Sequence, residues 1–428
     1  MNRYVLRCVK CGREYEDDGF RLRCDEDHEP AVLRTVYTKK SFSLQEHLPG
    51  MFKYYDLLPV HRILEGGAAP VTYKSERLSR YLGLDNLYII FNGYWPERNA
   101  FMETASFKEL EAPSVLARIP KDHHGTIVVA SAGNTGRAFA HICSRNHIPL
   151  LLVIPEDSAD QIWSIKPFRD NVKLICASGS SDYYDAIKLA EQIINLDGFF
   201  PEGGAFNVAR RDGMATTVLD CSYGAGRIPD HYFQAIGSGT GGIAAWECSL
   251  KLLGDGGYGQ KRMKLHLSQN YPFVPITETW NRGLKNIPPL DEEDAKMQIH
   301  ETCAKVLSNR QPPYSIRGGV YDVLTASSGY TYSVTNEEVF LAMRTFEEYE
   351  GIDICPEAGV AIGSLIQAIQ QKKVEKDDLI ALNITGGGER RVKRDNEVYF
   401  LEPFIKFTDK EINGKGIRKK LEDIFVVR

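Results

Sequence analysis

The stretch Thr104-Ala105-Ser106-Phe107-Lys108 is a run of small and apolar residues that ends in a single lysine. A lysine with such neighbours is poorly hydrated, which lowers its pKa and allows it to act as a neutral amine or to form a Schiff base. A lysine on a solvated surface is the commoner case, because lysine side chains are almost never buried without a partner. The significance of Lys108 therefore depends on what accompanies it in the chain.

The composition is that of an ordinary soluble globular protein. Of the 428 residues, 43% are hydrophobic and 25% are charged, and a chain of this length accommodates roughly two to four domains. The formal net charge of -5 provides no general attraction to nucleic acid or to an anionic membrane surface. The sequence has neither a signal-peptide pattern nor an apolar run long enough to span a bilayer. We therefore expect a cytoplasmic protein without nucleic-acid or membrane partners.

Three of the nine cysteines lie near the N-terminus, where Cys8 and Cys11 form a C-x-x-C pair and Cys24 is followed by His28. The C-x-x-C spacing presents two thiolates to one tetrahedral metal ion. The second pair is irregular, because three residues separate Cys24 from His28. The segment is therefore either a zinc site with three cysteines and His28 as ligands, or a ribbon that has kept its hairpin and lost the metal. The other six cysteines lie in apolar segments, so a disulfide framework is not expected.

Strand and helix patterns alternate through much of the chain. The predicted strands are Leu87–Phe91, Thr126–Ser131, Pro149–Ile154, Val172–Ala177, Tyr232–Ile236 and Leu379–Ile384. The predicted helices are Glu109–Ala117, which Pro113 is expected to interrupt, Thr135–Asn146, Asp182–Leu196, Ile243–Leu253, Glu337–Tyr349 and Ala358–Gln371. Such alternation predicts an α/β fold with parallel strands and crossover helices.

A glycine-rich loop, Gly237-Ser238-Gly239-Thr240-Gly241-Gly242, lies between a predicted strand and a predicted helix. Three of its glycines match the G-x-G-x-x-G pattern of dinucleotide-binding folds. That interpretation requires an acidic residue about twenty positions further on, where the chain has Gly257-Tyr258-Gly259-Gln260-Lys261-Arg262. More generally, a small-residue loop at a helix N-terminus presents backbone N–H groups that suit one phosphate monoester.

Two further small-residue loops follow predicted strands. Ser131-Ala132-Gly133-Asn134-Thr135-Gly136 begins a helix, where its N–H groups can hold a carboxylate and Asn134 offers a side-chain amide. Thr385-Gly386-Gly387-Gly388 follows the strand near the C-terminus. Three such loops together with one lysine among small residues are much less likely to occur by chance than any one of these features alone.

In this order, the four stretches strongly resemble the pyridoxal-phosphate enzymes of the tryptophan synthase β fold (fold type II), over roughly residues 60–400. The chain is most similar to the threonine synthase group, whose members often carry a small cysteine-knuckle module in front. More narrowly, it resembles the branch of that group that makes L-cysteate for coenzyme M synthesis. The resemblance implies a zinc-ribbon-like module at 1–50, a large cofactor domain formed by 51–111 and 215–428, and a small α/β domain at 112–214. Enzymes of this fold are commonly homo-oligomers.

The resemblance also assigns roles to residues. Lys108 becomes the Schiff-base lysine and general base, Asn134 the partner of the cofactor's ring hydroxyl, and Thr385 the partner of the pyridine nitrogen. The phosphate cradle is Gly237, Ser238, Gly239, Thr240 and Gly241. The substrate contacts are Ser106, Ser131, Gly133 and Thr135.

Two departures from the threonine synthase pattern bear on the reaction. Glu109 stands after the lysine where aspartate is usual, and Glu389-Arg390-Arg391 follows the last glycine loop, where threonine synthases tend to have a histidine between glycines. Both argue against threonine formation. A hydroxyl partner such as that of Thr385 leaves the pyridine nitrogen unprotonated, which favours elimination over transamination.

The expected reaction is β-elimination of phosphate from O-phospho-L-serine, followed by addition of sulfite to the aminoacrylate to give L-cysteate. Threonine synthase activity on O-phosphohomoserine is the nearest alternative. A binding protein that has lost the chemistry is disfavoured by the presence of Lys108, and a nicotinamide oxidoreductase by the absent acidic residue. Arginines suit the substrate oxyanions, and the candidates are Arg98, Arg137, Arg390 and Arg391.

Overall fold

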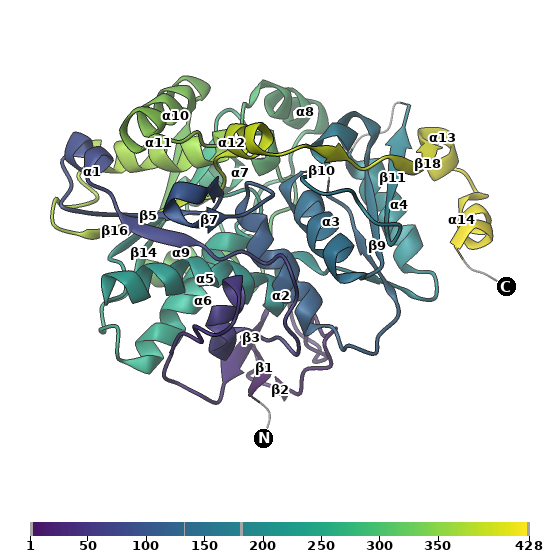
Figure 1. Ribbon diagram of the computed structural model, residues 1–428, viewed down its shortest axis with the longest axis horizontal. Coiled ribbons are helices and arrows are strands. Elements are labelled where there is room, and N and C mark those ends of the chain that lie inside the picture. The colour runs from purple at the N-terminus through teal and green to yellow at the C-terminus, as the bar shows by residue number, and fades with distance from the viewer. Residues whose placement is uncertain (1–2, 132, 180–182, 426–428) are drawn as a thin grey trace.

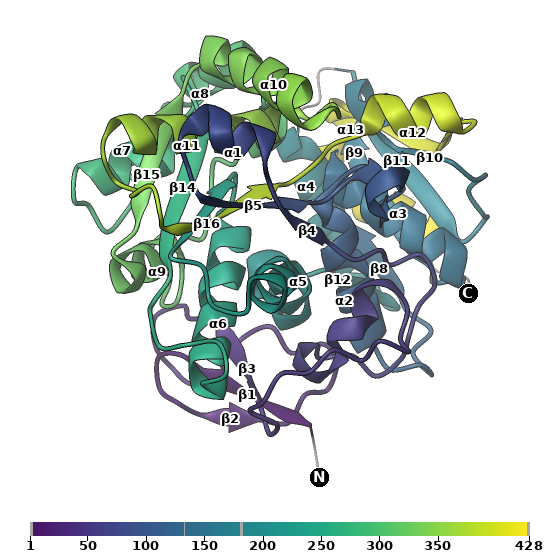
Figure 2. The same cartoon turned by 60° about the vertical axis from the view of Figure 1, so that its left-hand side comes forward.

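The computed structural model describes residues 3–131, 133–179 and 183–425 (Figure 1). Ala132 of the predicted asparagine loop and Asp182 of a predicted helix lie outside the described residues. The strands form two main sheets that lie beside each other, and three short strands near the N-terminus form a third sheet (Figures 1 and 2).

The larger sheet has six strands within the described residues, in the order β15-β14-β13-β16-β5-β4. Its pairings are parallel except for that between β4 and β5. The bounds are β4 (Val71–Lys74), β5 (Asn86–Phe91), β13 (His231–Ala235), β14 (Lys264–Asn270), β15 (Tyr330–Val334) and β16 (Leu379–Ile384). The central strands β13 and β16 are buried along their whole length, as expected for a parallel sheet covered on both faces.

The smaller sheet is entirely parallel and has five strands in the described part of the chain, in the order β12-β8-β9-β11-β18. The bounds are β8 (Thr126–Val129), β9 (Leu150–Pro155), β11 (Val172–Ser178), β12 (Phe199–Pro201) and β18 (Pro403–Thr408). Its edge strand β18 comes from near the C-terminus, although the sequence placed all of 215–428 in the large domain. The domain boundaries themselves stay a prediction.

Helices cover both faces of the larger sheet. α11 packs on β13 and β14 and against α10, whereas α5 packs against α2 and α6 on the opposite side (Figure 2). The bounds are α1 (Arg77–Leu82), α2 (Glu111–Arg118), α3 (Asn134–Asn146), α4 (Tyr183–Ile194), α5 (Val208–Ala225), α6 (Thr240–Asp255), α7 (Pro275–Asn281), α8 (Glu292–Glu301), α9 (Val320–Ser327), α10 (Asn336–Glu350), α11 (Pro356–Gln370), α12 (Glu389–Asp395), α13 (Asp409–Ile412) and α14 (Ile417–Phe425). None of the helices in the described ranges is both long and apolar enough to cross a bilayer.

Short elements complete the chain. Two-stranded ladders pair β6 (Tyr94–Trp95) with β7 (Ala100–Phe101) and β10 (Trp163–Ser164) with β17 (Tyr399–Phe400). The 3₁₀ turns are η1 (Gly50–Leu57), η2 (Pro96–Arg98), η3 (Phe107–Leu110), η4 (Glu156–Gln161), η5 (Gly204–Phe206) and η6 (Lys305–Leu307).

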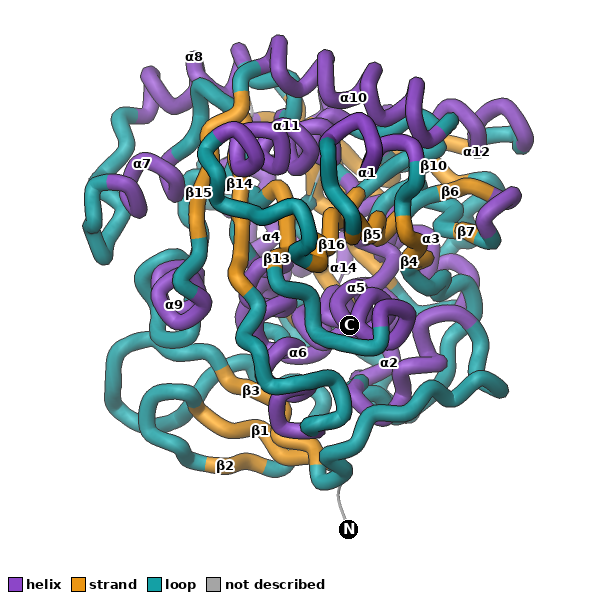
Figure 3. The backbone as a smooth tube through the Cα atoms, turned by 90° about the vertical axis from the view of Figure 1, so that its left-hand side faces the viewer, coloured by secondary structure: helices purple, strands orange, loops and turns teal. Residues whose placement is uncertain are grey.

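The N-terminal sheet joins β1 (Tyr4–Cys8), β2 (Glu14–Tyr15) and β3 (Leu33–Tyr37) in antiparallel order β2-β1-β3. Figure 3 shows it beneath α6, on the opposite side of the molecule from α10. Two acidic residues tie this sheet to the rest of the chain. Asp17 forms a buried ion pair with Arg118 at the end of α2, and Asp212 of α5 accepts hydrogen bonds from the hydroxyls of Thr35 and Tyr37.

The predicted strands and helices are present, and their ends shift by at most a few residues. The expectation for Pro113 was wrong. A 3₁₀ turn, η3, continues directly into α2, and Pro113 lies in the first turn of α2. Backbone N–H groups there have no intrahelical partner, so a proline does not interrupt the helix.

Candidate active site

A cavity of about 2130 Å³ opens at the carboxyl ends of β8, β13 and β16. Parallel α/β sheets bind their ligands at this end, because the strand-to-helix loops converge there. The predicted site residues that line the cavity are Lys108, Ser131, Gly133, Asn134, Thr135, Gly237, Ser238, Gly239, Thr240, Gly241 and Thr385. Loops that are far apart in the sequence thus share one space.

Ser106 is the predicted contact that does not line the cavity. It is buried, it is the N-cap residue of η3, and its Oγ accepts a hydrogen bond from the backbone N–H of Lys108 at 3.4 Å. The same segment is hydrogen-bonded to the last glycine loop, since Phe107 N–H donates to the carbonyl of Thr385 at 3.0 Å and Gly387 N–H to that of Ala105 at 3.1 Å. The lysine loop is therefore fixed against the end of β16.

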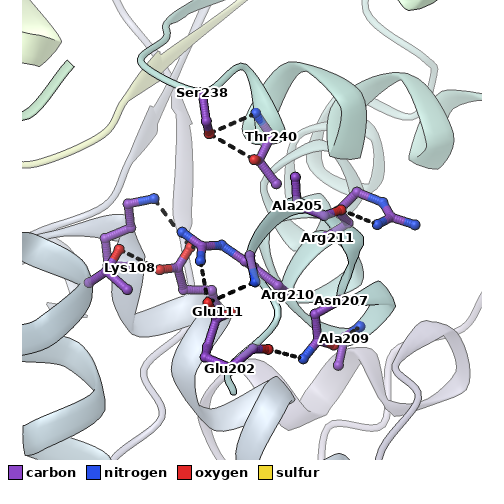
Figure 4. Close-up of polar contacts among 12 residues, drawn as sticks. Lys108, Glu111, Glu202, Ala205, Asn207, Ala209, Arg210, Arg211, Ser238 and Thr240 are labelled. Carbon is purple, nitrogen blue, oxygen red and sulfur yellow. Dashed lines mark hydrogen bonds and ion pairs between the residues drawn. The ribbon is translucent and has the colours of Figure 1, made fainter. Parts of the chain in front are cut away.

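Lys108 belongs to a buried cluster of charges (Figure 4). Its Nζ lies 3.2 Å from Glu111 Oε2, and the same oxygen lies 3.1 Å from Arg210 Nε. Arg210 Nη1 also pairs with Glu202 at 2.7 Å. Burial lowers the pKa of Lys108, and the Arg210 guanidinium lowers it further, whereas Glu111 raises it. For Glu111 burial acts to raise the pKa, but Arg210 and Lys108 outweigh it and hold the carboxyl below its ordinary pKa.

The glycine-rich loop forms a tight cradle at the start of α6. Gly239 has a φ of 80° and is the N-cap residue of the helix, and a Cβ there would lie 2.3 Å from Val320 Cγ2. The hydroxyls of Ser238 and Thr240 are 2.8 Å apart (Figure 4), and both residues line the cavity. The loop thus combines backbone N–H groups, two hydroxyls and the positive end of a 16-residue helix, which together suit a phosphate.

Asn134 is held in place by charged neighbours. Its Nδ2 donates to Glu357 Oε1 at 2.8 Å, and its Oδ1 accepts from Arg137 Nη2 at 2.6 Å. The Arg137 side chain is buried and stacks on Trp163, with 4.5 Å between its guanidinium carbon and the ring centre. This arrangement keeps the Asn134 amide at the cavity wall.

Thr385 is the first residue after β16 and is buried. Its Oγ1 has no hydrogen-bond partner among the described residues. Because an unsatisfied buried hydroxyl is costly, this atom marks a place where a bound group supplies the partner.

The arginine candidates for the substrate oxyanions separate into two groups. Arg137 and Arg390 line the cavity. Arg98 instead stacks on Tyr73 and Trp95, and Arg391 pairs with Glu97 and Asp395.

Sequence reasoning missed the charged residues around the lysine, namely Glu111, Glu202 and Arg210. The only signal for Glu111 was its position three residues after Lys108, which places both side chains on one side of a helical turn. Nothing local pointed to Arg210, because α5 was not among the predicted helices. Its contact with Glu111 depends on the packing of α5 against α2.

The four metal-ligand candidates lie together in the N-terminal module. The ligand atoms of Cys8, Cys11, Cys24 and His28 are all within 4.8 Å of one another. Cys8 Sγ is 3.5 Å from His28 Nε2, and Cys11 Sγ is 3.6 Å from Cys24 Sγ. His28 Nδ1 is 2.7 Å from the carbonyl of Glu29, which leaves Nε2 for a metal. Three thiolates and one imidazole at these separations fit tetrahedral zinc.

Comparison with known proteins places this site in a family. A family model described as pyridoxal-phosphate dependent enzyme matches residues 66–386. Curated cysteate synthases from Methanosarcina acetivorans and Methanosarcina barkeri are 48% and 47% identical, over 96% of this chain and 98% and 99% of theirs. The chain belongs to the cysteate synthase family of pyridoxal-phosphate-dependent enzymes. The solved structure of maize serine racemase, at 14% identity, covers 74% of this chain and 89% of its own with a TM-score of 0.57, a likeness of fold.

The cavity residues of this pyridoxal-phosphate-dependent enzyme fit the cofactor in three respects. The cradle at Gly239 leaves no room for a side chain beside the backbone N–H groups. The hydroxyl of Thr385 is buried and lacks a partner among the described residues. Lys108, whose pKa is lowered mainly by burial, lines the same cavity. These features would suit the cofactor's phosphate, one atom of its ring and its covalent link to an amine.

Proposed function

We propose that this enzyme forms L-cysteate from O-phospho-L-serine and sulfite, with pyridoxal phosphate as cofactor. The observation that carries the proposal is the near-complete match, at almost half identity, to curated cysteate synthases. The cavity supports it, because the lysine, the phosphate cradle and the hydroxyl at β16 all line one space. As part of the same proposal, the protein works as a cytoplasmic homo-oligomer.

The residues divide the work as follows. Lys108 would hold the cofactor covalently, and its neutral amine would take the proton from the substrate Cα. The cradle from Gly237 to Gly241 would hold the cofactor phosphate, Asn134 its ring hydroxyl and Thr385 its pyridine nitrogen. When bound, the cofactor supplies an electron sink that makes the Cα proton acidic and allows the Cβ substituent to leave.

The walls of the cavity suit a reaction between two anions. Phosphoserine and sulfite both carry oxyanions, for which guanidinium groups are well-matched partners. The buried Arg137, the largely buried Arg210 and the exposed Arg390 all line the cavity. Substitution of Arg137 or Arg210 should therefore raise the KM for the anionic substrates.

The test offers the purified enzyme phosphoserine with and without sulfite, and O-phosphohomoserine with water, while phosphate and the amino-acid product are measured. From phosphoserine with sulfite we expect cysteate and an equal amount of phosphate. Without sulfite no cysteate should form. Lys108→Ala should reduce turnover to background, because it removes both the covalent anchor and the base. Threonine as the main product would contradict the substrate assignment and leave the cofactor assignment intact.

A further inference from the structure

Glu111 lies behind the proposed Schiff-base lysine, away from the cavity. Its side chain is completely buried and does not line the cavity, whereas Lys108 and Arg210 do. One carboxylate oxygen, Oε2, lies 3.2 Å from Lys108 Nζ and 3.1 Å from Arg210 Nε, and the other accepts a hydrogen bond from Thr135 Oγ1 at 2.7 Å. Figure 4 shows the carboxylate between the lysine and the arginine.

Residues in the N-terminal turns of three helices fix the position of this carboxylate. Glu111 is the first residue of α2, Thr135 lies in the first turn of α3 and Arg210 in that of α5. The positive end of α2 stabilises a negative charge at its own first residue. Because the carboxylate is fixed by these contacts, its ion pair with Lys108 restricts the position of Nζ.

The charge on Nζ is sensitive to Glu111. Burial and the Arg210 guanidinium both lower the pKa of Lys108, and Glu111 is the largest influence that raises it. During the reaction the Cα–H bond breaks, its electron pair stays with the substrate, and the proton bonds to the lone pair of Nζ. A positive charge therefore appears 3.2 Å from Oε2 of the fully buried Glu111, and a preorganised charge acts strongly on charge that develops during a reaction.

We propose that Glu111 is a positioning residue of this enzyme: it orients Lys108 Nζ and stabilises the protonated form of that amine during turnover. This inference rests on the role proposed above for Lys108. It adds to the site a residue that touches neither the substrate nor the cavity.

A second buried glutamate provides a matched control. Glu109 lies in the same turn, is also completely buried, and accepts hydrogen bonds at 2.8 Å from the backbone N–H and the hydroxyl of Thr104. Burial raises its pKa to about 8, so its carboxyl is mainly protonated at neutral pH. Glu109→Gln therefore changes a neutral buried group into another neutral group of similar shape.

The experiment compares the holoenzymes of Glu111→Gln, Glu111→Asp and Glu109→Gln with the wild type. Two measurements are made: kcat and KM as a function of pH, and the pH midpoint of the visible absorbance of the bound cofactor without substrate. For Glu111→Gln we expect kcat to fall by roughly 10- to 100-fold, part of the 10²–10⁴-fold effect of a positioned base, with KM little changed. The absorbance midpoint and the acidic limb of kcat should move to lower pH by about one unit. Glu111→Asp should recover part of both, and Glu109→Gln should leave the absorbance midpoint and the pH dependence of kcat unmoved.

A Glu111→Gln enzyme whose kcat falls while its absorbance midpoint and pH profile stay unchanged would overturn the inference, because a merely structural role predicts that result. If Glu111→Gln does not fold by circular dichroism, Glu111→Asp is decisive, since an unshifted profile in that variant overturns the inference equally. Visible cofactor absorbance and turnover in Lys108→Ala would instead contradict the proposed role of Lys108. The two failures are therefore distinguishable.

Discussion

The hydroxyl of Thr385 is the group that we propose to lie next to the pyridine nitrogen of the cofactor. It is buried at the end of β16 and has no hydrogen-bond partner among the described residues. A hydroxyl next to the pyridine nitrogen leaves that nitrogen unprotonated, whereas a carboxylate would favour its protonated form. The electron sink is then shallow, which favours loss of the Cβ substituent over transamination.

Replacing Thr385 by aspartate should reverse this preference. We expect Thr385→Asp to gain transamination and new long-wavelength absorbance, while elimination slows by about tenfold, or roughly 1.4 kcal/mol in the barrier. Spectra and product partitioning with phosphoserine measure both effects. Thr385→Ser, which keeps the hydroxyl, serves as the control, and unchanged partitioning in Thr385→Asp would show that this residue does not contact the ring nitrogen.

At the scale of elements, the N-terminal module is attached to the helices that carry the site. The Arg118 guanidinium at the end of α2 donates to Asp17 at 2.6 and 2.8 Å and to Asn207 Oδ1 at 3.1 Å. Asn207 is the N-cap residue of α5, three residues before Arg210. One buried arginine thus connects the module to both α2 and α5.

Removing this arginine should destabilise the protein strongly. Both side chains of the pair are almost completely buried, and loss of one partner of such a pair costs about 3–5 kcal/mol. For Asp17 burial acts to raise the pKa, but Arg118 lowers it more, so the stability from its charge is present above its ordinary pKa of 3.8 and is lost as the pH falls through the lower folded-state value. In Arg118→Met the unpaired Asp17 is destabilising until it is protonated.

We therefore expect the loss of unfolding free energy in Arg118→Met to be larger at pH 7 than near pH 4.5. The double variant Arg118→Met/Asp17→Asn should recover part of this loss. Urea unfolding of both variants at the two pH values measures this. An equal loss at both values would contradict the ion-pair explanation.

The cysteine cluster predicts a dependence on metal. Because a structural zinc site contributes its binding energy to folding, protein purified without chelator should contain about one zinc per chain, and Cys11→Ser or chelation should lower the Tm. Less than about a tenth of an equivalent of zinc in a normally folded protein would indicate a ribbon that has lost its metal. Elemental analysis with thermal unfolding decides between the two.

The elements that sequence could predict are those with a clear hydrophobic period or a glycine loop at one end. The alternating units from residue 126 on belong to this class, as do β16 and α6. α5 does not, because it is buried on nearly all sides and carries no amphipathic stripe, and it contains Gly213, Thr216 and Thr217. Because α5 was not predicted from the sequence, Arg210 and the charged cluster around Lys108 were not predicted either.

At the scale of the whole molecule, the fold brings strand ends from distant parts of the chain to one cavity. The order of the loops in the sequence was enough to predict this convergence through the resemblance. The return of the chain to the smaller sheet as β18 could not be predicted, because an edge strand of alternating exposure near the C-terminus fits either sheet. Pairing between strands so far apart is set by tertiary packing and not by local pattern.

The larger sheet also contains a row of hydrogen-bonded titratable groups at the amino ends of its strands, opposite the ends that line the cavity. His231 Nε2 lies 3.0 Å from Asp378 Oδ2, His231 Nδ1 lies 2.8 Å from His266 Nε2, and His266 Nδ1 lies 2.7 Å from the hydroxyl of Tyr332. Burial lowers the pKa of His266 well below its ordinary value, and His231 and two lysines, Lys264 and Lys373, lower it further. Burial also lowers the pKa of His231, although Asp378 partly opposes this.

We expect this row of side chains to make the folded protein less stable in mild acid. A histidine that stays neutral in the folded state but takes a proton near pH 6.5 when unfolded contributes stability above that pH, and the contribution is lost as the pH falls below it, at about 1.4 kcal/mol per pH unit for each such group. We expect the free energy of unfolding to decline from pH 6.5 towards pH 5, and His266→Gln to flatten that decline while lowering stability at pH 7.5. The exposed His47 provides the matched control, because His47→Gln should leave the slope unchanged. Urea unfolding at several pH values measures the slopes, and a His266→Gln slope equal to that of the wild type would show that His266 does not take up a proton when the protein unfolds in this range.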